Sequence, residues 1–203
     1  MYNKYLKRLF DIVLSILAFP FVAVVVVLSA PVIYFTDKGP VFYNAYRLGR
    51  NGKNFKMFKL RTMKVNSPDI RNVDGSTFNG ENDPRQTKCG KFFRKTSIDE
   101  IPQFLNVLVG DMSLVGPRPV LATNNVNDFD DVQLKIISVR PGITGYVQAY
   151  FRNSIGQAEK FEKDLFYVEH MNFLFDLKIV FKTIEAVIKR EKVFVEQSPS
   201  TAG

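Results

Sequence analysis

Hydrophobic residues form one long N-terminal run and then recur at shorter intervals along the rest of the chain. The run extends from Ile12 to Phe35 and contains almost no polar residue. As a helix it is long enough to span the hydrocarbon core of a bilayer, which is about 30 Å thick. It is too long for a cleaved signal peptide, and no A-x-A site follows it. The pattern predicts that residues 1–36 hold the protein in a membrane.

Two features leave the path of this run open. Pro20 lies inside it and removes a helical hydrogen bond. Basic residues flank it on both sides, and positive charge prefers the cytoplasmic side of a membrane. These residues are Lys4, Lys7 and Arg8 before the run, and Lys38, Arg47, Arg50, Lys53 and Lys56 after it. A helix that crosses and a re-entrant helix that bends at Pro20 are equally compatible with the residues alone.

Short strands are predicted immediately after the membrane run. Val41–Tyr43 and Phe55–Lys59 have strand character, and the Asn-Gly pair between Arg50 and Lys53 is a hairpin signal. Lysines alternate with Phe and Met in the second strand, so one face is basic. That face is either solvated or directed at lipid or phosphate. Residues 66–88 are rich in turn formers and predict a long loop.

The second half of the chain is predicted to be mainly helical. Residues 157–167 and 173–192 have helical spacing, whereas Val147–Ser154 resembles a strand. The last helix is amphipathic and basic, which fits either core packing or a helix lying on a bilayer. We expect an α+β, mainly helical chain with its folded part over residues 37–196 and a disordered tail over 197–203.

Two adjacent carboxylates, Asp99 and Glu100, stand at the predicted start of a short helix that Gly110 would end. Structural capping explains them in one of two ways. Ser97 and Glu100 could form a capping box, or Asp99 could be the N-cap with Pro102 in the first turn. Arginines on both sides favour phosphate chemistry instead.

Composition narrows the classes of function. The chain has 203 residues and a net charge of +8, which indicates an anionic partner. A single cysteine, Cys89, excludes an internal disulfide, and a single histidine, His170, argues against a histidine-based metal site. No nucleic-acid recognition motif accompanies the charge, and the apolar run argues against that class of partner, so no nucleic acid is expected.

The order of motifs is more informative than any one of them. A proline-interrupted apolar run is followed by GPVFY, KMFKLRTM, SIDE, LNVLVGDMSLVGPRP and RPGITGYVQ. Together these blocks resemble the bacterial sugar transferase family, the small monotopic polyprenol-phosphate phosphoglycosyl transferases. The resemblance extends from about Lys7 to Arg190. The small form is expected because no multi-span region precedes the catalytic part.

The resemblance implies an enzyme that transfers sugar-1-phosphate from a UDP-sugar to undecaprenyl or another polyprenol phosphate and releases UMP. The sugar is expected to be N-acetylated or amino-deoxy, and the product to start a surface polysaccharide or glycan. The resemblance also implies Mg²⁺, a re-entrant helix broken at Pro20, and a catalytic part at the cytoplasmic face of the bacterial inner membrane. Membrane lipid and downstream glycosyltransferases are the further partners it suggests.

Site residues follow from the same resemblance. Asp99 is expected to be the nucleophile, through an aspartyl-phosphosugar intermediate, and a magnesium ligand. Glu100 is expected to position or deprotonate the acceptor phosphate. The remaining candidates are residues expected to bind phosphate or substrate: Lys59, Arg94, Arg118, Arg152 and Asp164. Two departures from the family pattern are Phe19, where a serine usually precedes the proline, and Tyr146, where a tryptophan is common.

A non-catalytic alternative is a peripheral membrane scaffold that binds anionic lipid through its basic surface. It would need Asp99 only for folding.

Overall fold

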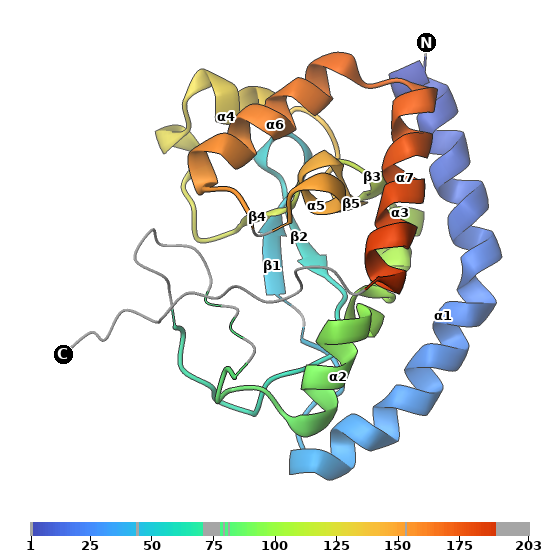
Figure 1. The fold of residues 1–203 in the computed structure, drawn as a ribbon, viewed down its shortest axis with the longest axis vertical. Coiled ribbons are helices and arrows are strands. Elements are labelled where there is room, and N and C mark those ends of the chain that lie inside the picture. Colours follow the sequence, from blue (N-terminus) through green and yellow to red (C-terminus); the bar gives the residue numbers. More distant parts are fainter. Residues whose placement is uncertain are drawn as a thin grey trace.

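The computed structural model describes residues 2–43, 45–70, 78, 80, 82–152 and 154–189 (Figure 1). The predicted tail at 197–203 and the residues from 190 to 196 lie outside this part. A long N-terminal helix runs along one side of a mixed domain that contains two small sheets and shorter helices. The prediction of a mainly helical α+β chain is confirmed.

The N-terminal helix α1 spans Lys7–Asp37 and follows a π-helical turn, Tyr2–Leu6. It continues through both Pro20 and Pro31, so the predicted helix break at Pro20 is wrong for this structure. The helix bows, and its lower part turns beneath α2 (Figure 1). The structure does not show whether α1 is re-entrant.

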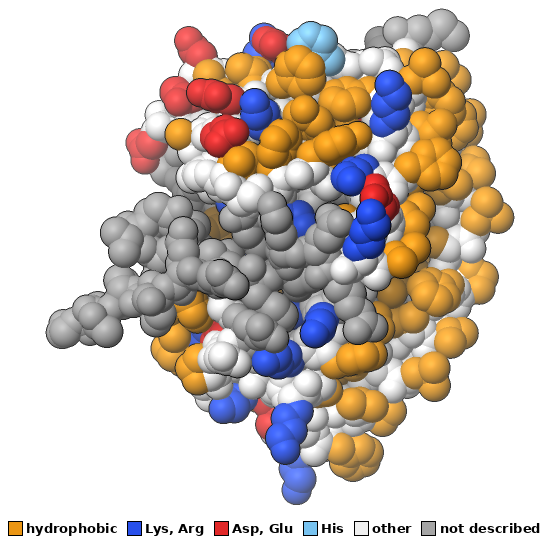
Figure 2. Space-filling model, in the orientation of Figure 1, with side chains coloured by type: hydrophobic (Ala, Val, Ile, Leu, Met, Phe, Trp, Pro, Cys, Tyr) orange, Lys and Arg blue, Asp and Glu red, His pale blue; other side chains and the backbone are white. Residues whose placement is uncertain are grey.

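One face of α1 is apolar and exposed, and it forms the orange margin of the molecule in Figure 2. Its large exposed side chains are Leu9, Phe10, Val13, Leu14, Ile16, Leu17, Phe19, Phe21, Val24, Val27, Leu28, Val32, Tyr34 and Phe35. The polar residues Asp11, Ser15 and Ser29 are buried on the opposite face, against the domain. Among the described residues, α1 is the one helix long and apolar enough to cross a membrane.

Polar contacts attach the first turns of α1 to the domain. Arg8 donates to the carbonyl oxygens of Val107 and Leu108, at 2.6 and 3.0 Å. Asp11 accepts from the hydroxyl of Ser113 and the backbone N–H of Leu114, at 3.0 and 2.9 Å. The basic residues before the apolar run are therefore partly occupied in binding the domain, a role that their charge alone did not indicate.

The other end of α1 is attached as firmly. Asp37, its last residue, forms a two-pronged ion pair with the guanidinium of Arg61, with both N–O distances at 2.6 Å. Paired hydrogen bonds of this kind fix geometry as well as charge. Ile33 packs with Leu60 and Phe93 in a small core cluster beside it. Both ends of the apolar helix thus bind the same domain.

A three-stranded antiparallel sheet has the order β2-β1-β4, from β1 (Ala45–Leu48), β2 (Asn54–Met57) and β4 (Val120–Leu121). The predicted hairpin turn is confirmed, with Asn51 and Gly52 at φ 55° and 74°. The first strand begins later than Val41–Tyr43, where Phe42 makes only an isolated bridge to Leu60. The second sheet pairs β3 (Ser113–Val115) with β5 (Gly142–Thr144) in parallel.

The shorter helices are α2 (Lys88–Thr96), η3 (Ile98–Glu100), α3 (Gln103–Val109), η4 (Val126–Asp128), α4 (Asp131–Ile136), α5 (Tyr146–Tyr150), α6 (Gln157–His170) and α7 (Phe173–Ile188). The helices predicted at 157–167 and 173–192 are confirmed as α6 and as α7 within the described residues. The strand predicted at Val147–Ser154 is wrong, because this segment begins with α5.

Packing explains why α5 is helical. Val147 and Ala149 are buried, and Ala149 joins Val115, Tyr167 and Ile179 in one core cluster. The ring of Tyr146 contacts the surrounding rings of Tyr150, Phe151, Phe166 and Phe175 at centroid distances of 5.2–5.7 Å. Tertiary contacts therefore override the strand preference of this sequence.

Candidate active site

Asp99 and Glu100 lie in the short helix η3, between α2 and α3. Ser97 ends α2 in the left-handed conformation, with φ 57°, and makes no side-chain cap. The predicted capping box is therefore absent. Asp99 is not the N-cap of α3 either, because Pro102 occupies that position. Gly110 ends α3 with φ 97°, as predicted. The carboxylate pair lacks the capping roles proposed for it, which leaves both groups available for chemistry.

The position of Asp99 is fixed by its backbone. Its carbonyl oxygen accepts from the N–H of Leu60 at 2.9 Å, and its residue surface is only 2% exposed. This bond brings the segment after β2 alongside η3. Lys59, the residue before Leu60, therefore lies next to the carboxylates of Asp99 and Glu100.

Lys59 binds both carboxylates at once. Its Nζ lies 2.9 Å from Asp99 Oδ2 and 2.9 Å from Glu100 Oε1. Burial works against the charge of Lys59, but the two carboxylates outweigh it and raise the Lys59 pKa. Burial also disfavours the Glu100 carboxylate, yet the Lys59 and Arg118 charges keep the Glu100 pKa below its ordinary value. The charges of Lys59 and Arg118 therefore keep the Glu100 side chain ionised at neutral pH.

Arginines extend the positive field around the pair. Arg94, near the end of α2, donates from Nε to the hydroxyl of Thr62 at 3.0 Å, and burial lowers its pKa. The charge of Arg94 acts on Asp99 and Glu100. Arg118 is exposed and also acts on Glu100. Both arginines suit an incoming phosphate.

Asp164 lies on α6 and is 7% exposed. Burial raises its pKa to about 7, against the opposing effect of Arg118 and Lys160. Asp164 is therefore buried within the fold and is not a solvated surface carboxylate. Arg152 follows α5 with φ 48°. The structure thus brings together Lys59, Arg94, Arg118 and the carboxylate pair.

A magnesium ion would find few protein ligands here. Among the described residues, no group of three or more acidic, His or Cys side chains could hold a metal. Mg²⁺, however, commonly takes only one or two carboxylates together with substrate phosphates and water. Asp99 and Glu100 fit that donor set, although Lys59 now occupies one oxygen of each.

Two buried groups that support the site were not anticipated. Asn106 on α3 is fully buried and bonds to the backbone of β2 and its extension, donating to Lys56 O and accepting from Phe58 N, both at 2.8 Å. The Arg61–Asp37 pair holds the segment two residues beyond Lys59. The KLRTM block contains Arg61, but nothing in its spacing points to Asp37.

The model of the family described as Bacterial sugar transferase matches residues 2–190. This chain belongs to the bacterial sugar transferase family. Its similarity therefore covers α1, the lysine-bridged carboxylates and the helices α5 to α7 together.

Named relatives differ in length. The sugar transferase EpsL of Bacillus subtilis is 40% identical over 188 residues, which cover 93% of this chain and 90% of the relative. The undecaprenyl-phosphate galactose phosphotransferase of Salmonella typhimurium is 37% identical over 95% of this chain. The UDP-glucose:undecaprenyl-phosphate glucose-1-phosphate transferase of Escherichia coli is 41% identical over 90% of it. The chain matches only 42% and 40% of these last two proteins.

Proposed function

We propose that this protein transfers sugar-1-phosphate from a UDP-sugar to undecaprenyl phosphate, releases UMP, and so begins the assembly of a surface polysaccharide or glycan. The relatives named for this chemistry support the reaction class. The observation that carries the proposal is the buried Asp99 carboxylate, held with Glu100 around Lys59 and within the field of two arginines. The sugar is proposed to be N-acetylated or amino-deoxy.

The first step is a substitution at the sugar-bearing phosphorus of the donor. An oxygen of Asp99 attacks this phosphorus, the bond to the bridging oxygen breaks, and UMP leaves with the electron pair. An aspartyl phosphosugar remains on the enzyme, so one difficult transfer is divided into two. Lys59, Arg94 and Arg118 offset the charge that gathers on the phosphates.

In the second step, an oxygen of the polyprenol phosphate attacks the same phosphorus and Asp99 is released as a carboxylate. Glu100 is ionised and 31% of its side chain is exposed, so it can receive a proton from the incoming phosphate or orient it. Arg152 and Asp164 are proposed to contact substrate. When bound, Mg²⁺ would be held by Asp99 and Glu100 and would neutralise part of the phosphate charge.

The contacts at the two ends of α1 indicate how the protein attaches to the membrane. Both ends of α1 bind the same domain, through Arg8 and Asp11 at one end and Asp37 at the other. A helix that crossed the bilayer would separate its ends and break one set of contacts. We therefore place α1 in the inner membrane with both ends at the cytoplasmic face, where the donor is soluble.

Asp99→Asn tests the function directly. The variant should fold normally, release no UMP, and form no phosphosugar adduct when radiolabelled UDP-sugar is supplied without acceptor. Wild-type protein should form the adduct under the same conditions. A screen of UDP-sugars for UMP release identifies the donor. Normal turnover by Asp99→Asn would disprove the aspartyl mechanism. Failure of the wild-type protein to release UMP from any UDP-sugar would favour a lipid-binding scaffold instead.

A further inference from the structure

Two acceptor oxygens, one on α5 and one on α6, are shielded from solvent and receive no hydrogen bond from the described residues. They are Oδ1 of Asp164 and Oε1 of Gln148. Native structures leave few buried polar atoms unsatisfied, because an acceptor without a donor disfavours folding. Asp164 is proposed above only to contact substrate, and Gln148 has no role in that chemistry. Both need donors, which a ligand could supply.

Gln148 Oε1 lies beside the segment Gly116–Arg118. A Cβ built on Gly145 would lie 2.1 Å from the carbonyl oxygen of Gly116 and 2.7 Å from Gln148 Oε1, so these oxygens are near neighbours. On α6, Tyr167 follows Asp164 by about one turn and donates to Val115 O at 3.2 Å. This face of α6 therefore covers the start of the same segment.

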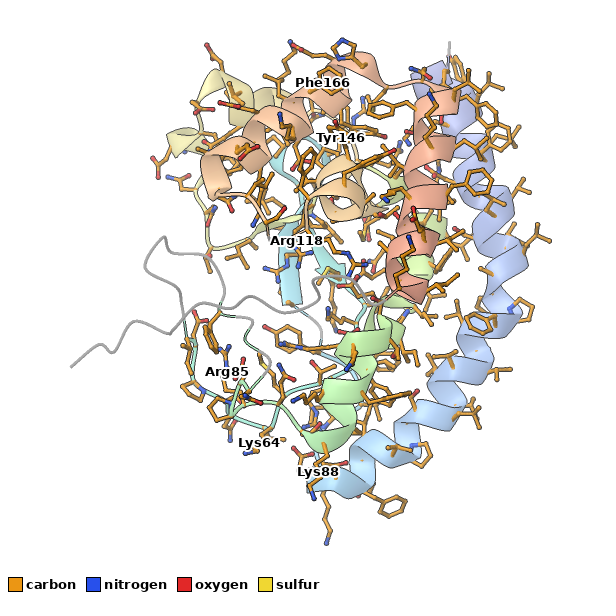
Figure 3. The ribbon with its side chains drawn as sticks, in the orientation of Figure 1. Lys64, Arg85, Lys88, Arg118, Tyr146 and Phe166 are labelled. Atoms are coloured by element: carbon orange, nitrogen blue, oxygen red, sulfur yellow. The ribbon has the colours of Figure 1, made fainter. Side chains whose placement is uncertain are left out.

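Arg118 connects this region to the carboxylate pair. Its charge acts on both Glu100 and Asp164, so it lies within electrostatic reach of each. Figure 3 shows Arg118 below α5 and α6, between them and the lower part of the domain. A substrate whose phosphates lie at Arg118 and the carboxylate pair would extend its next group toward Asp164 and Gln148.

The chemistry of the two oxygens restricts that group. Acceptors require hydroxyl or N–H donors, and a negatively charged phosphate cannot supply them in its ionised form. The polyprenol phosphate offers only hydrocarbon beyond its phosphate. A nucleotide sugar carries hydroxyl groups on its hexose and on its ribose, on either side of the diphosphate.

We propose that Asp164 and Gln148 accept hydrogen bonds from hydroxyl groups of the nucleotide-sugar donor and thereby contribute to the choice of donor. The inference rests on the proposed function and adds a binding role for Gln148. It also has a consequence for stability. Because the oxygens lack donors in the free protein, replacing them with apolar groups should not destabilise the fold, whereas a structural role would make it do so.

The test uses Asp164→Leu and Gln148→Leu in the full-length protein, with Glu162→Leu as the control. Glu162 is exposed on the same helix. Unfolding temperatures should stay equal or rise. The KM for the UDP-sugar should increase on the order of ten- to a hundredfold for Asp164→Leu, where a buried carboxyl acceptor is lost, and several-fold for Gln148→Leu. The KM for undecaprenyl phosphate and the behaviour of Glu162→Leu should match wild type.

Two further measurements distinguish the hexose from the ribose. If the hexose is bound, inhibition by UMP is unchanged in the variants, and a deoxy-hexose donor lowers the wild-type rate but not the variant rate. If the ribose is bound, UMP inhibition weakens in both variants. Either result supports the proposal.

An unchanged donor KM in both Leu variants would overturn it, and a fall in unfolding temperature with that unchanged KM would assign the oxygens to a buried water. If Asp164→Leu does not fold, Asp164→Ala replaces it, and a wild-type donor KM there would also count against the proposal. The proposed function is judged separately, because Asp99→Asn would remain inactive in each of these cases.

Discussion

At the scale of single residues, Lys59 sets the charge of the candidate site. It is the ion-pair partner of both carboxylates, at 2.9 Å from each. Two neighbouring carboxyl groups without a cation nearby would not both ionise readily, because the charge of one raises the pKa of the other. The Lys59 ammonium group offsets the negative charge of both carboxylates and keeps the Glu100 pKa below its ordinary value.

Replacing Lys59 by Met should make activity sensitive to acid. Burial alone raises the Glu100 pKa, and Lys59 is the main cause that lowers it. Without Lys59 the carboxylate is protonated at higher pH, so the acid limb of the kcat/KM profile should move upward. The profile of UMP release measures this shift. Lys59→Arg should largely restore the limb, and Lys56→Met, at an exposed position on β2, should leave it in place. An unmoved limb in Lys59→Met would contradict the assignment.

Asp164 should make stability depend on pH. Its pKa is raised from 3.8 to about 7 in the folded protein, so it favours folding below pH 4 and loses that contribution as pH rises through 7. The loss between pH 5 and 8 is on the order of 3 kcal/mol. Denaturant unfolding in detergent micelles measures it. Asp164→Asn should remove this slope, whereas Glu162→Gln should keep it. Equal slopes in wild type and Asp164→Asn would show that Asp164 titrates normally.

At the scale of elements, the parts with local chemical signals were predictable. The Asn51-Gly52 hairpin, the helix end at Gly110 and the helices α6 and α7 follow from residues within each segment. The strand expected at Val147–Ser154 was wrong because the aromatic cluster around Tyr146 decides its conformation, and those partners lie on α6 and α7. Local preference carries no information about such partners.

The meeting of Lys59 with Asp99 could not be derived from spacing. Forty positions separate them (99 − 59 = 40), and the contact depends on the backbone bond from Leu60 to Asp99. Resemblance to the family supplied Lys59, Arg94 and Arg118 as candidates, and the structure places them around the pair. Asn106 was missed because an asparagine among apolar residues of a helix gives no sign that it bonds to a strand.

Asn106→Leu should loosen the contact between α3 and β2. It would leave Lys56 O and Phe58 N without their partners, at a cost on the order of 3 kcal/mol in the free energy of unfolding. Thermal unfolding should show the loss, and UMP release should fall because Lys59 follows directly. Asn54→Leu is the control, since Asn54 is an exposed asparagine on the same strand. If Asn106→Leu is as stable as the control, the side chain does not hold the strand.

At the scale of the whole molecule, the path of α1 is the open question that an experiment can settle. Its ends bind one domain, and its outer face is apolar along its length (Figure 2). The sequence left a crossing helix and a returning helix equally possible, because charge symmetry and Pro20 are local signals. The contacts at its two ends favour a path that keeps both ends of the unbroken helix on one side of the membrane.

Cysteines introduced at Asn3 and Asn51, each in a Cys89→Ser background, should test this topology. Both should resist an impermeant thiol reagent added to intact cells, because both lie on the cytoplasmic side in the proposed arrangement. Both should react once the cells are permeabilised. Labelling at position 3 but not at position 51 in intact cells would establish that α1 crosses the membrane.

The attachment of α1 at both ends also determines how far the candidate site lies from the membrane in which α1 is proposed to sit. Arg8 donates hydrogen bonds to the last carbonyl groups of α3. Asp37 forms an ion pair with Arg61, which lies two residues after Lys59. If α1 lies in lipid, the fold fixes the distance of Asp99 from the acyl chains. Lipid phosphate must then lie at that distance, and polyprenols of different length present the same headgroup to the site. The polyprenol tail would remain in the bilayer, so the catalytic site would not distinguish acceptors by the length of that tail.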